Sequence, residues 1–546
     1  MEFSCFNRAE TIRRLNEERF EILIIGGGIT GVGIALDAAS RGCKVALVEQ
    51  MDFAYGTSSR STKLIHGGLR YLKQLEFALV KEVGSERAIV HSLAPHLVVP
   101  EKMLLPLYEK RGMGYGLTSI GLKIYDWLAG VKRVDQRKML TRQQTLLQEP
   151  LLKAEDVKGG ALYAEYRTDD ARLTIEIAKR ACREGAVLIN YVEANDFIMG
   201  DGHISGVKAF DKEAATMFHI HAKTVVNAAG PWVDELRTKN RSRDGKTLRL
   251  TKGVHIVVPY HRFPVRQAIY FDVPDGRMIF AIPRGRTTYI GTTDTDYKGN
   301  LHDVSVALDD VRYLTSAVNE TFPSVHLTVA DVESSWAGLR PLIHEEGKSA
   351  SELSRKDEIF ESPSGLISIA GGKLTGYRKM SERVVDKILE NGIDDPPACG
   401  TDKLLLANSD FKDLDDVNRF TQSIAYATEN IGLKGEAGAY LVHMYGKQAG
   451  RIVEDAASRK NENPDVNLVQ AEVSFSVSEE CVVHAEDFFV RRTGWLYFDI
   501  HRLIRAKETA LAEMASLLGW SSARIDEERN RVDQLIKKAA TFELNL

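Results

Sequence analysis

The chain has 546 residues, of which 44% are hydrophobic and 27% charged, which is typical of a soluble globular protein with two or three domains. Its formal net charge of -4 does not favour nucleic acid as a partner, and we expect none. The 5 cysteines are scattered and lack metal-ligand spacing, which indicates a reducing compartment and no metal site. Neither a signal peptide nor an apolar run of about 18 residues is visible. We therefore expect a cytoplasmic protein, either free or attached to a membrane surface.

The first elements in chain order form a strand, helix, strand unit. Glu21 to Ile25 is a near-continuous apolar run, typical of a parallel strand buried on both faces. Ile29 to Arg41 has helical apolar spacing, and Gly42 ends that helix well. Lys44 to Val48 is predicted as the second strand.

A glycine-rich turn joins the first strand to the helix. Residues 26–31 read GGGITG, which supplies the GxGxxG pattern of a dinucleotide site directly after a strand and at a helix start. Glu49 closes the second strand, where an acidic residue can accept hydrogen bonds from ribose hydroxyls. The turn therefore predicts pyrophosphate binding at the helix N-terminus. The residues predicted to contact the dinucleotide here are Gly26, Gly28, Ile29, Thr30, Gly31 and Glu49.

A long polar loop follows this unit. Its hydroxyls and backbone amides can line a pyrophosphate and a ribityl chain, although taken alone the loop is better explained as a solvated surface segment. The candidate contacts are Thr57, Ser58, Ser59, Ser61 and Lys63.

Strand and helix patterns alternate further along the chain. Asp170 to Glu184 is predicted as an amphipathic helix and Val187 to Tyr191 as a strand, after which Val192 is a candidate adenine contact. His203 to Phe210 and Met217 to His221 are predicted to form a hairpin, and Thr224 to Ala228 a separate short strand.

The last part of the chain changes character. Residues 250–335 are rich in short β-like segments, and Gly365 to Ala370 is a strand that ends in a glycine pair. Ile393 to Lys403 contains two prolines and is the best linker candidate, and residues 404–546 have mostly helical patterns.

The sequence resembles the FAD-dependent glycerol-3-phosphate dehydrogenase family. The match is carried by residues 25–42, by residues 61–72 (STKLIHGGLRYL), by residues 227–232 (NAAGPW) and by residues 371–378 (GGKLTGYR). Arg491, Arg492 and Thr493 also resemble the helical domain of this family.

The resemblance implies an α/β plus α fold. It comprises a glutathione-reductase-like Rossmann domain for FAD, a substrate domain with an antiparallel sheet, and a C-terminal helical domain. We expect the FAD-binding domain at residues 19–75, 150–250 and 330–395, the substrate domain at 76–149 and 251–329, and the helical domain at 403–546.

The resemblance also implies the activity: oxidation of sn-glycerol 3-phosphate to dihydroxyacetone phosphate by hydride transfer from C2 to N5 of FAD. Electrons then pass to a membrane quinone, and the enzyme works at the inner membrane surface. We expect the FAD to be non-covalently bound, and a homodimer is compatible with the sequence. A glycerol-3-phosphate oxidase that uses oxygen is the closest alternative, and a flavin amino-acid oxidase is a more distant one.

The substrate phosphate requires fixed cations. The predicted substrate-binding residues are Arg70, Tyr71, His255, Arg340 and Lys373, of which His255, Arg340 and Lys373 are also predicted to be catalytic. Arginine offers a planar fork of donors to phosphate, and histidine titrates in the range needed for proton transfer. For His255, a packed residue in a β-strand is an equally good explanation.

The motifs that match the family add further predicted cofactor contacts. These are Leu64, His66, Gly67, Gly68, Ala229, Gly230, Trp232, Gly372, Lys373, Leu374 and Thr375.

The segment from Tyr115 to Arg133 mixes apolar and basic residues. That composition suits an interfacial helix at a membrane, and it suits slightly better an ordinary helix packed on the substrate domain.

Overall fold

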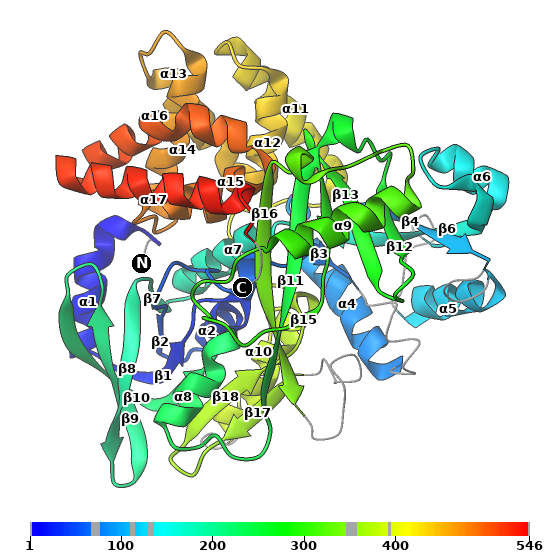
Figure 1. Ribbon diagram of the computed structural model, residues 1–546. Coiled ribbons are helices and arrows are strands. Elements are labelled where there is room, and N and C mark those ends of the chain that lie inside the picture. Colours follow the sequence, from blue (N-terminus) through cyan, green and yellow to red (C-terminus); the bar gives the residue numbers. More distant parts are fainter. Residues whose placement is uncertain are drawn as a thin grey trace.

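A computed structural model describes residues 3–66, 77–109, 115–128, 136–344, 357–390 and 395–543. It contains two β-sheets, with a group of C-terminal helices packed against them (Figure 1).

The first sheet has a parallel centre. Strands β18, β10, β1, β2 and β7 pair in parallel in that order, β17 pairs antiparallel with β18 at one edge, and a hairpin of β8 and β9 is added to β10. The parallel strands are buried because their residues are almost all apolar, as in Ile22–Ile25 of β1. The strands are β1 (Arg19–Ile25), β2 (Val45–Val48), β7 (Val187–Ile189), β8 (Val192–Gly200), β9 (His203–Asp211), β10 (Thr216–Asn227), β17 (Glu358–Glu361) and β18 (Leu366–Ala370).

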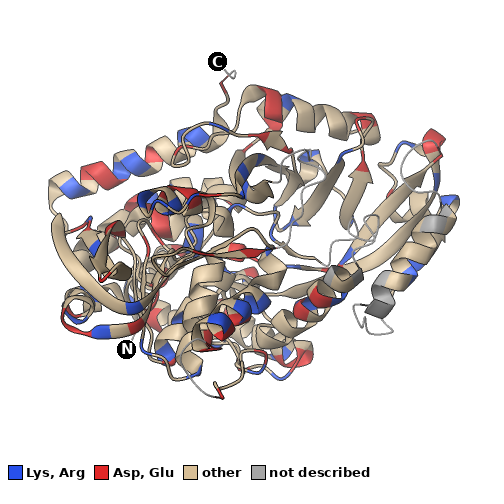
Figure 2. Cartoon of the chain, turned by 90° about the horizontal axis from the view of Figure 1, so that it is seen from below, with Lys and Arg blue, Asp and Glu red and all other residues tan. Residues whose placement is uncertain are grey.

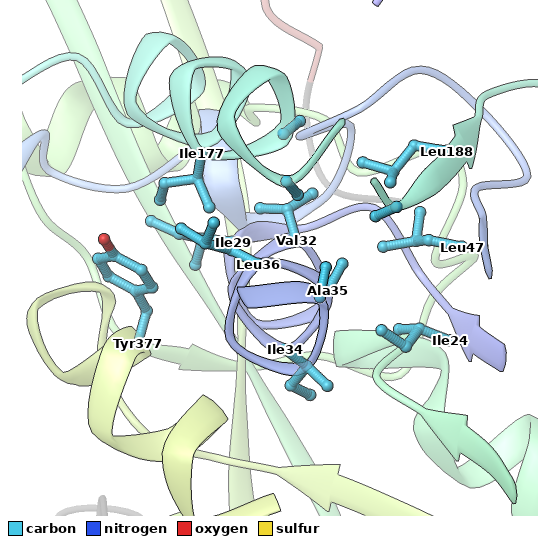
Figure 3. Close-up of a cluster of buried hydrophobic side chains, with 14 of the residues drawn as sticks. Ile24, Ile29, Val32, Ile34, Ala35, Leu36, Leu47, Ile177, Leu188 and Tyr377 are labelled. Carbon is cyan, nitrogen blue, oxygen red and sulfur yellow. The ribbon is translucent and has the colours of Figure 1, made fainter. Parts of the chain in front are cut away.

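Three helices cover one face of this sheet. Helix α2 (Ile29–Ser40) lies between α7 (Asp170–Arg183) and α10 (Tyr377–Glu390) and packs on the strands below it. Figure 3 shows its apolar side chains between Ile177 of α7, Tyr377 of α10 and Ile24 of β1. The predicted strand, helix, strand unit is thus confirmed, and its helix is fixed by contacts on three sides.

Strand β10 differs from the prediction. The segments Met217 to His221 and Thr224 to Ala228 were expected to be separate strands, but they form one strand, Thr216–Asn227. Its first half pairs antiparallel with β9, and its second half pairs parallel with β1. No glycine or proline lies between the two segments, so nothing in the chain interrupts the extended backbone.

The second sheet is mostly antiparallel. Its order is β15-β11-β14-β13-β12-β4-β6-β3, with β16 paired to β11 and β5 paired to β6. Helix α9 (Leu308–Thr321) covers it and contributes to an apolar core (Figure 1). The strands are β3 (Leu64–Ile65), β4 (Val99–Tyr108), β5 (Lys138–Thr141), β6 (Val157–Arg167), β11 (Thr247–Pro259), β12 (Ala268–Asp272), β13 (Met278–Arg284), β14 (Thr287–Gly291), β15 (Thr295–Asp296) and β16 (Ser334–His344).

Three strands pair in a different sheet from the one that the predicted domain ranges suggest. Strands β3, β6 and β16 fall in ranges that were assigned to the FAD-binding domain, yet all three belong to the second sheet. The chain crosses between the sheets more often than expected, because an apolar alternating pattern shows that a segment is a strand without showing its partner.

The C-terminal part is helical, as predicted. It packs on both the first sheet's helix α7 and the second sheet, where α17 contacts β16. A π-helical turn spans Asp487–Arg492. The helices are α11 (Leu414–Asn430), α12 (Gly435–Tyr445), α13 (Ala449–Ser458), α14 (Pro464–Glu479), α15 (Trp495–Phe498), α16 (Ile500–Leu518) and α17 (Ser522–Ala540). The other helices of the chain are α1 (Arg8–Glu17), α4 (Phe77–Leu93), α5 (Tyr115–Leu128), α6 (Arg142–Gln148) and α8 (Val233–Lys239).

Charged residues are mixed by sign over the outer helices (Figure 2). Within the part of the chain that the structure describes, no helix combines the length and the apolar character needed to cross a bilayer.

Candidate functional site

A large cavity runs along the edge of the first sheet where its parallel strands end. Its walls follow the carboxyl ends of β18, β10, β1 and β2 and the start of β8, which is the usual position for a ligand in a sheet of this type. The space free of protein atoms, including the part open to solvent, is about 1320 Å³. The cavity extends from Glu49 and Val192 at one end to Gly371–Leu374 at the other, which suits an extended ligand such as a dinucleotide.

Most of the predicted cofactor residues line this cavity. They are Gly26, Gly28, Ile29, Thr30, Glu49, Thr57, Ser58, Ser61, Val192, Ala229, Gly230, Trp232, Gly372, Lys373 and Leu374.

The glycine turn allows close approach at the middle of the cavity. Gly26 has a φ of +116°, and a Cβ there would lie 2.6 Å from the Ala228 carbonyl oxygen. Gly28 is the N-cap of α2 and offers no side-chain cap. The start of α2 therefore offers backbone N–H groups to a ligand, which favours a phosphate, although the Ile29 N–H itself donates to the Ser58 hydroxyl.

Glu49 lies to one side of this turn. Its Oε2 accepts a hydrogen bond from the Gly27 N–H at 2.6 Å, and its Oε1 accepts one from the Met51 N–H at 2.9 Å. Burial raises the pKa of the Glu49 carboxyl, while these two N–H groups act in the opposite direction. Val192 is next to it, since the Val192 N–H donates to the Glu49 carbonyl at 2.9 Å. Each carboxylate oxygen keeps a lone pair that can accept from a ribose hydroxyl.

The opposite end of the cavity is formed by the second glycine motif. Gly371 and Gly372 have φ values of +80° and +79°, and Lys373 follows at the start of a short 3₁₀ turn. Both φ values lie in the left-handed region, which favours glycine at these two positions. The phosphate position lies between these two ends. The predicted contacts assign Glu49 and Val192 to the adenosine end of the cofactor and Gly371–Leu374 to its flavin end.

The polar loop is partly built into the protein. The Ser58 hydroxyl accepts from the Ile29 N–H at 2.9 Å, and the Thr57 hydroxyl donates to the Leu339 carbonyl at 2.7 Å. Lys63 is fully buried, where its ammonium group is paired with Asp170 and donates to the Ser59 carbonyl at 3.1 Å. Its charge is therefore neutralised away from the cavity, contrary to its predicted role as a cofactor contact.

Five other predicted contacts also lie outside the cavity wall. Thr375 and His66 are bound to each other, with the His66 N–H donating to the Thr375 hydroxyl at 3.1 Å and that hydroxyl donating to the His66 carbonyl at 3.2 Å. A Cβ on Gly31 would lie 1.9 Å from the Gly26 carbonyl oxygen, so Gly31 allows the helix to pack on the turn. The set that supports the wall without lining it is Gly31, Ser59, Leu64, His66 and Thr375. Gly67, Gly68, Arg70 and Tyr71 lie outside the described residues.

Arg340 and His255 lie on paired strands of the second sheet, beside the flavin end. Arg340 directly precedes Pro341, which lines the cavity, and its guanidinium binds Thr292 Oγ1 at 2.9 Å and Asp294 Oδ1 at 3.1 Å. His255 is buried and stacks on Trp336 with ring centroids 4.8 Å apart.

The His255 imidazole is held in its neutral form. Burial, together with the nearby charges of Arg340 and Lys63, lowers its pKa well below the usual value. Its Nε2 lies 3.0 Å from the Thr62 hydroxyl, and its Nδ1 has no hydrogen-bond partner among the described residues.

Trp232 gives a further test of whether a cofactor fits. Its indole Nε1 is buried and lacks a hydrogen-bond partner within the described part of the chain, although the residue lines the cavity. A buried indole N–H normally has a partner, and a bound ligand can supply one. Sequence reasoning missed Tyr55 and Ala194, which also line the cavity and carry no motif signal. Across the described ranges, no cluster of three or more His, Cys, Asp or Glu side chains has the arrangement of a metal site.

Comparisons with known proteins agree with this geometry. A family model described as FAD dependent oxidoreductase matches residues 21–378, and one described as the C-terminal domain of alpha-glycerophosphate oxidase matches residues 399–525. The fold and the site thus define an FAD-dependent oxidoreductase, with FAD as its cofactor. The predicted α/β Rossmann-type fold with a helical C-terminal domain is confirmed.

Comparisons with individual proteins indicate a more specific family within this class of oxidoreductases. An aerobic glycerol-3-phosphate dehydrogenase of Staphylococcus aureus (strain NCTC 8325) is 46% identical over 547 residues, covering 99% of this chain and 98% of the relative. The Bacillus subtilis (strain 168) protein of that name is 46% identical over 545 residues, or 98% of each chain. The crystal structure of the Bacillus halodurans glycerol-3-phosphate dehydrogenase complexed with FAD superposes with a TM-score of 0.86 at 43% identity, covering 100% of both chains. The chain belongs to the aerobic glycerol-3-phosphate dehydrogenase family.

Proposed function

We propose that this protein oxidises sn-glycerol 3-phosphate to dihydroxyacetone phosphate and passes the electrons to a membrane quinone. The observation that carries the proposal is the 46% identity, over 99% of the chain, to a protein called aerobic glycerol-3-phosphate dehydrogenase. The site supports it, because the cavity is lined by Lys373 and by Pro341, which follows Arg340 in the chain, and cationic side chains suit a phosphorylated alcohol.

Bound FAD supplies the acceptor for the hydride that leaves C2 of the substrate, at its N5 atom. The residues of the chain then have two tasks, to hold the dianionic phosphate and to accept the hydroxyl proton. Arg340 and Lys373 are proposed to bind substrate oxygens from the second sheet and from the glycine motif, respectively. Arg340 is pre-oriented for this role by Thr292 and Asp294.

His255 is the proposed proton acceptor. A base must be unprotonated before it can act, and the environment of His255 keeps it so. A dianionic substrate beside Arg340 adds negative charge to this environment. That charge raises the pKa of His255 when substrate is bound, so the proton is accepted at Nδ1 only in the complex.

The direct test is anaerobic bleaching of the flavin absorbance of purified protein on adding sn-glycerol 3-phosphate. Rapid bleaching that glycerol and amino acids do not reproduce supports the proposed substrate. Flavin-loaded protein that is not bleached by sn-glycerol 3-phosphate refutes it.

The acceptor is tested next. The match of residues 399–525 to a model named for an oxidase keeps oxygen as a second candidate acceptor. Reoxidation of the bleached protein by a soluble quinone analogue, much faster than by air, supports the quinone; fast reoxidation by air with peroxide formation supports the oxidase. A glycine oxidase of Geobacillus kaustophilus has a TM-score of 0.53 at 21% identity, which shows a shared fold and does not favour amino acids as substrates.

The mode of flavin binding and the location complete the proposal. Non-covalent FAD is supported by the cavity, whose described lining residues include no cysteine or histidine nucleophile. Flavin that stays on the chain after denaturation would contradict it.

Attachment to the inner membrane surface is supported by Ile120 of α5, which is 59% exposed, whereas Leu122 of that helix is buried in the core. Flotation with anionic lipid vesicles tests this attachment, and light scattering tests the proposed homodimer.

A further inference from the structure

Two adjacent arginines of the C-terminal helical domain reach into the FAD-binding part of the molecule. Arg492 donates from Nη1 and Nη2 to the two carboxylate oxygens of Asp52 at 2.7 and 2.8 Å, and Arg491 donates from Nε to Asp52 Oδ2. All three side chains are at most 3% exposed. A two-pronged, fully buried contact of this kind fixes both partners in position.

The two arginines face several carboxylates. Asp487 accepts from Arg491 Nη2 at 2.7 Å, and Glu486 Oε1 lies 3.5 Å from the same nitrogen. Burial by itself raises the pKa of Asp52, but the charges of Arg492 and Arg491 outweigh that effect and lower it to about 2. We call Asp52, Asp487, Arg491 and Arg492 the arginine clamp. Asp52 is ionised at neutral pH, whereas burial, together with the charge of Asp52, raises the pKa of Asp487. The proposed substrate site does not use the clamp.

The clamp holds the loop that follows Glu49. Asp52 lies one residue beyond Met51, whose N–H orients Glu49 Oε1. Arg491 also contacts the Tyr55 ring, with its guanidinium carbon 5.6 Å from the ring centroid, and Tyr55 lines the cavity. Both ends of this loop are thereby attached to the C-terminal domain.

The same cluster holds the facing turn. Tyr191 has a φ of +57°, which a tyrosine rarely adopts, so its surroundings must maintain it. Its hydroxyl donates to Asp487 at 2.6 Å, and its N–H donates to the Met51 carbonyl at 2.9 Å. Asn190 donates to Asp52 Oδ1 at 3.1 Å. Val192 follows this turn, so both walls of the adenosine end depend on the clamp.

We propose that Arg491 and Arg492 are positioning residues for the adenosine half of FAD. Through Asp52 and Asp487, the C-terminal domain holds the Glu49 loop and the turn before Val192 in the arrangement that the adenosine requires. This role does not depend on which substrate or electron acceptor the enzyme uses. Because coupling between sites is reciprocal, bound FAD also stabilises the clamp.

The test uses Arg492→Lys, which keeps the charge and loses the two-pronged contact. FAD release from the full-length holoenzyme is followed by flavin fluorescence. Binding of ADP and of FMN is measured on the full chain after flavin removal, since ADP carries the adenosine half and FMN lacks it. We expect FAD and ADP to bind roughly tenfold more weakly, within the usual range for coupled sites, and the FMN affinity to be unchanged. Unchanged FAD and ADP affinities, or an equal loss for FMN, would overturn the proposal.

Arg172→Lys is the matched control. Arg172 is also fully buried and also joins the C-terminal domain, through a two-pronged contact with Glu480 at 2.7 Å. The Glu480 backbone carbonyl also accepts from Arg492, but Arg172 itself does not contact the Glu49 loop. It should lower the thermal stability without changing ADP affinity, and an equal loss of ADP affinity in both variants would show a general structural effect instead.

A second measurement needs no variant. In the wild-type chain, FAD should slow amide hydrogen exchange in residues 487–492, although they do not line the cavity. Exchange there that is unaffected by FAD would contradict the coupling, even if Arg492→Lys failed to fold.

Discussion

Gly31→Ala gives the sharpest test of how the FAD site is built. Alanine is the better helix former by about 1 kcal/mol, so the substitution in α2 would stabilise an isolated helix. In the protein, however, the new Cβ would lie 1.9 Å from the Gly26 carbonyl oxygen. A Cβ atom in a real protein essentially never lies closer than 3.0 Å to such a neighbouring heavy atom. The start of α2 must therefore move by about 1 Å, which costs about 1–3 kcal/mol, as overpacking does elsewhere.

The same movement carries the phosphate-binding N–H groups away from the cavity. We expect the FAD dissociation constant to rise at least tenfold, which corresponds to about 1.4 kcal/mol, as measured by flavin fluorescence titration. Gly121→Ala is the control, because Gly121 is also helical, in α5, and nothing lies within 4 Å of its added Cβ. Gly31→Ala protein that binds FAD as tightly as the control would refute this account of the turn.

Three further results are expected. Arg340→Ala should raise the KM for sn-glycerol 3-phosphate at least about tenfold, because a charged hydrogen bond contributes about 1.5–3 kcal/mol. The bound flavin content should be unchanged. An unchanged KM in steady-state assays would exclude Arg340 from substrate binding. Trp232→Phe should weaken FAD binding about fivefold through loss of one hydrogen bond of about 1 kcal/mol, without lowering the melting temperature of the flavin-free protein. Burial, with the charges of His443 and Arg172, lowers the pKa of His96 to about 3, so the unfolded chain binds a proton there below pH 6.5 that the native protein does not. The free energy of unfolding should then fall with decreasing pH, by up to about 1.4 kcal/mol per pH unit from this residue. Denaturant titrations between pH 6 and 4.5 should show that the unfolding free energy of His96→Gln depends less steeply on pH than that of the wild type.

Local pattern was enough to predict the Rossmann unit and the helical C-terminal part. The apolar run before Gly26 and the helical spacing after Gly28 are properties of adjacent residues, so they are visible in the sequence. Partners that are distant along the chain are not visible in this way. This explains why the pairing of β6 and β16 with the second sheet could not be predicted, and why β10 was divided in two.

Prediction of the site from the sequence has the same limit, because partners distant along the chain are not visible in it. Lys63 lies in a family motif beside cofactor residues, yet its charge is used by Asp170, more than 100 residues away in the sequence. Arg491 and Arg492 were visible as a motif, but their partner Asp52 carries no signal that would separate it from any other acidic residue in a loop. Burial decides the role of each of these charges, and burial is a property of the folded chain.

The strand order of the first sheet has a consequence for synthesis of the protein. Strand β10 pairs with β1 on one side and with β18 on the other, and β18 (Leu366–Ala370) is synthesised much later than β10. About 140 residues separate the end of β10 from the start of β18, which at roughly 5–20 residues per second is a delay of about 7–28 s. Throughout that interval the nascent chain presents Val225–Asn227 as an open, apolar strand edge. A slow step or a pause within this stretch of translation should therefore expose the polypeptide to aggregation well before the flavin pocket can exist.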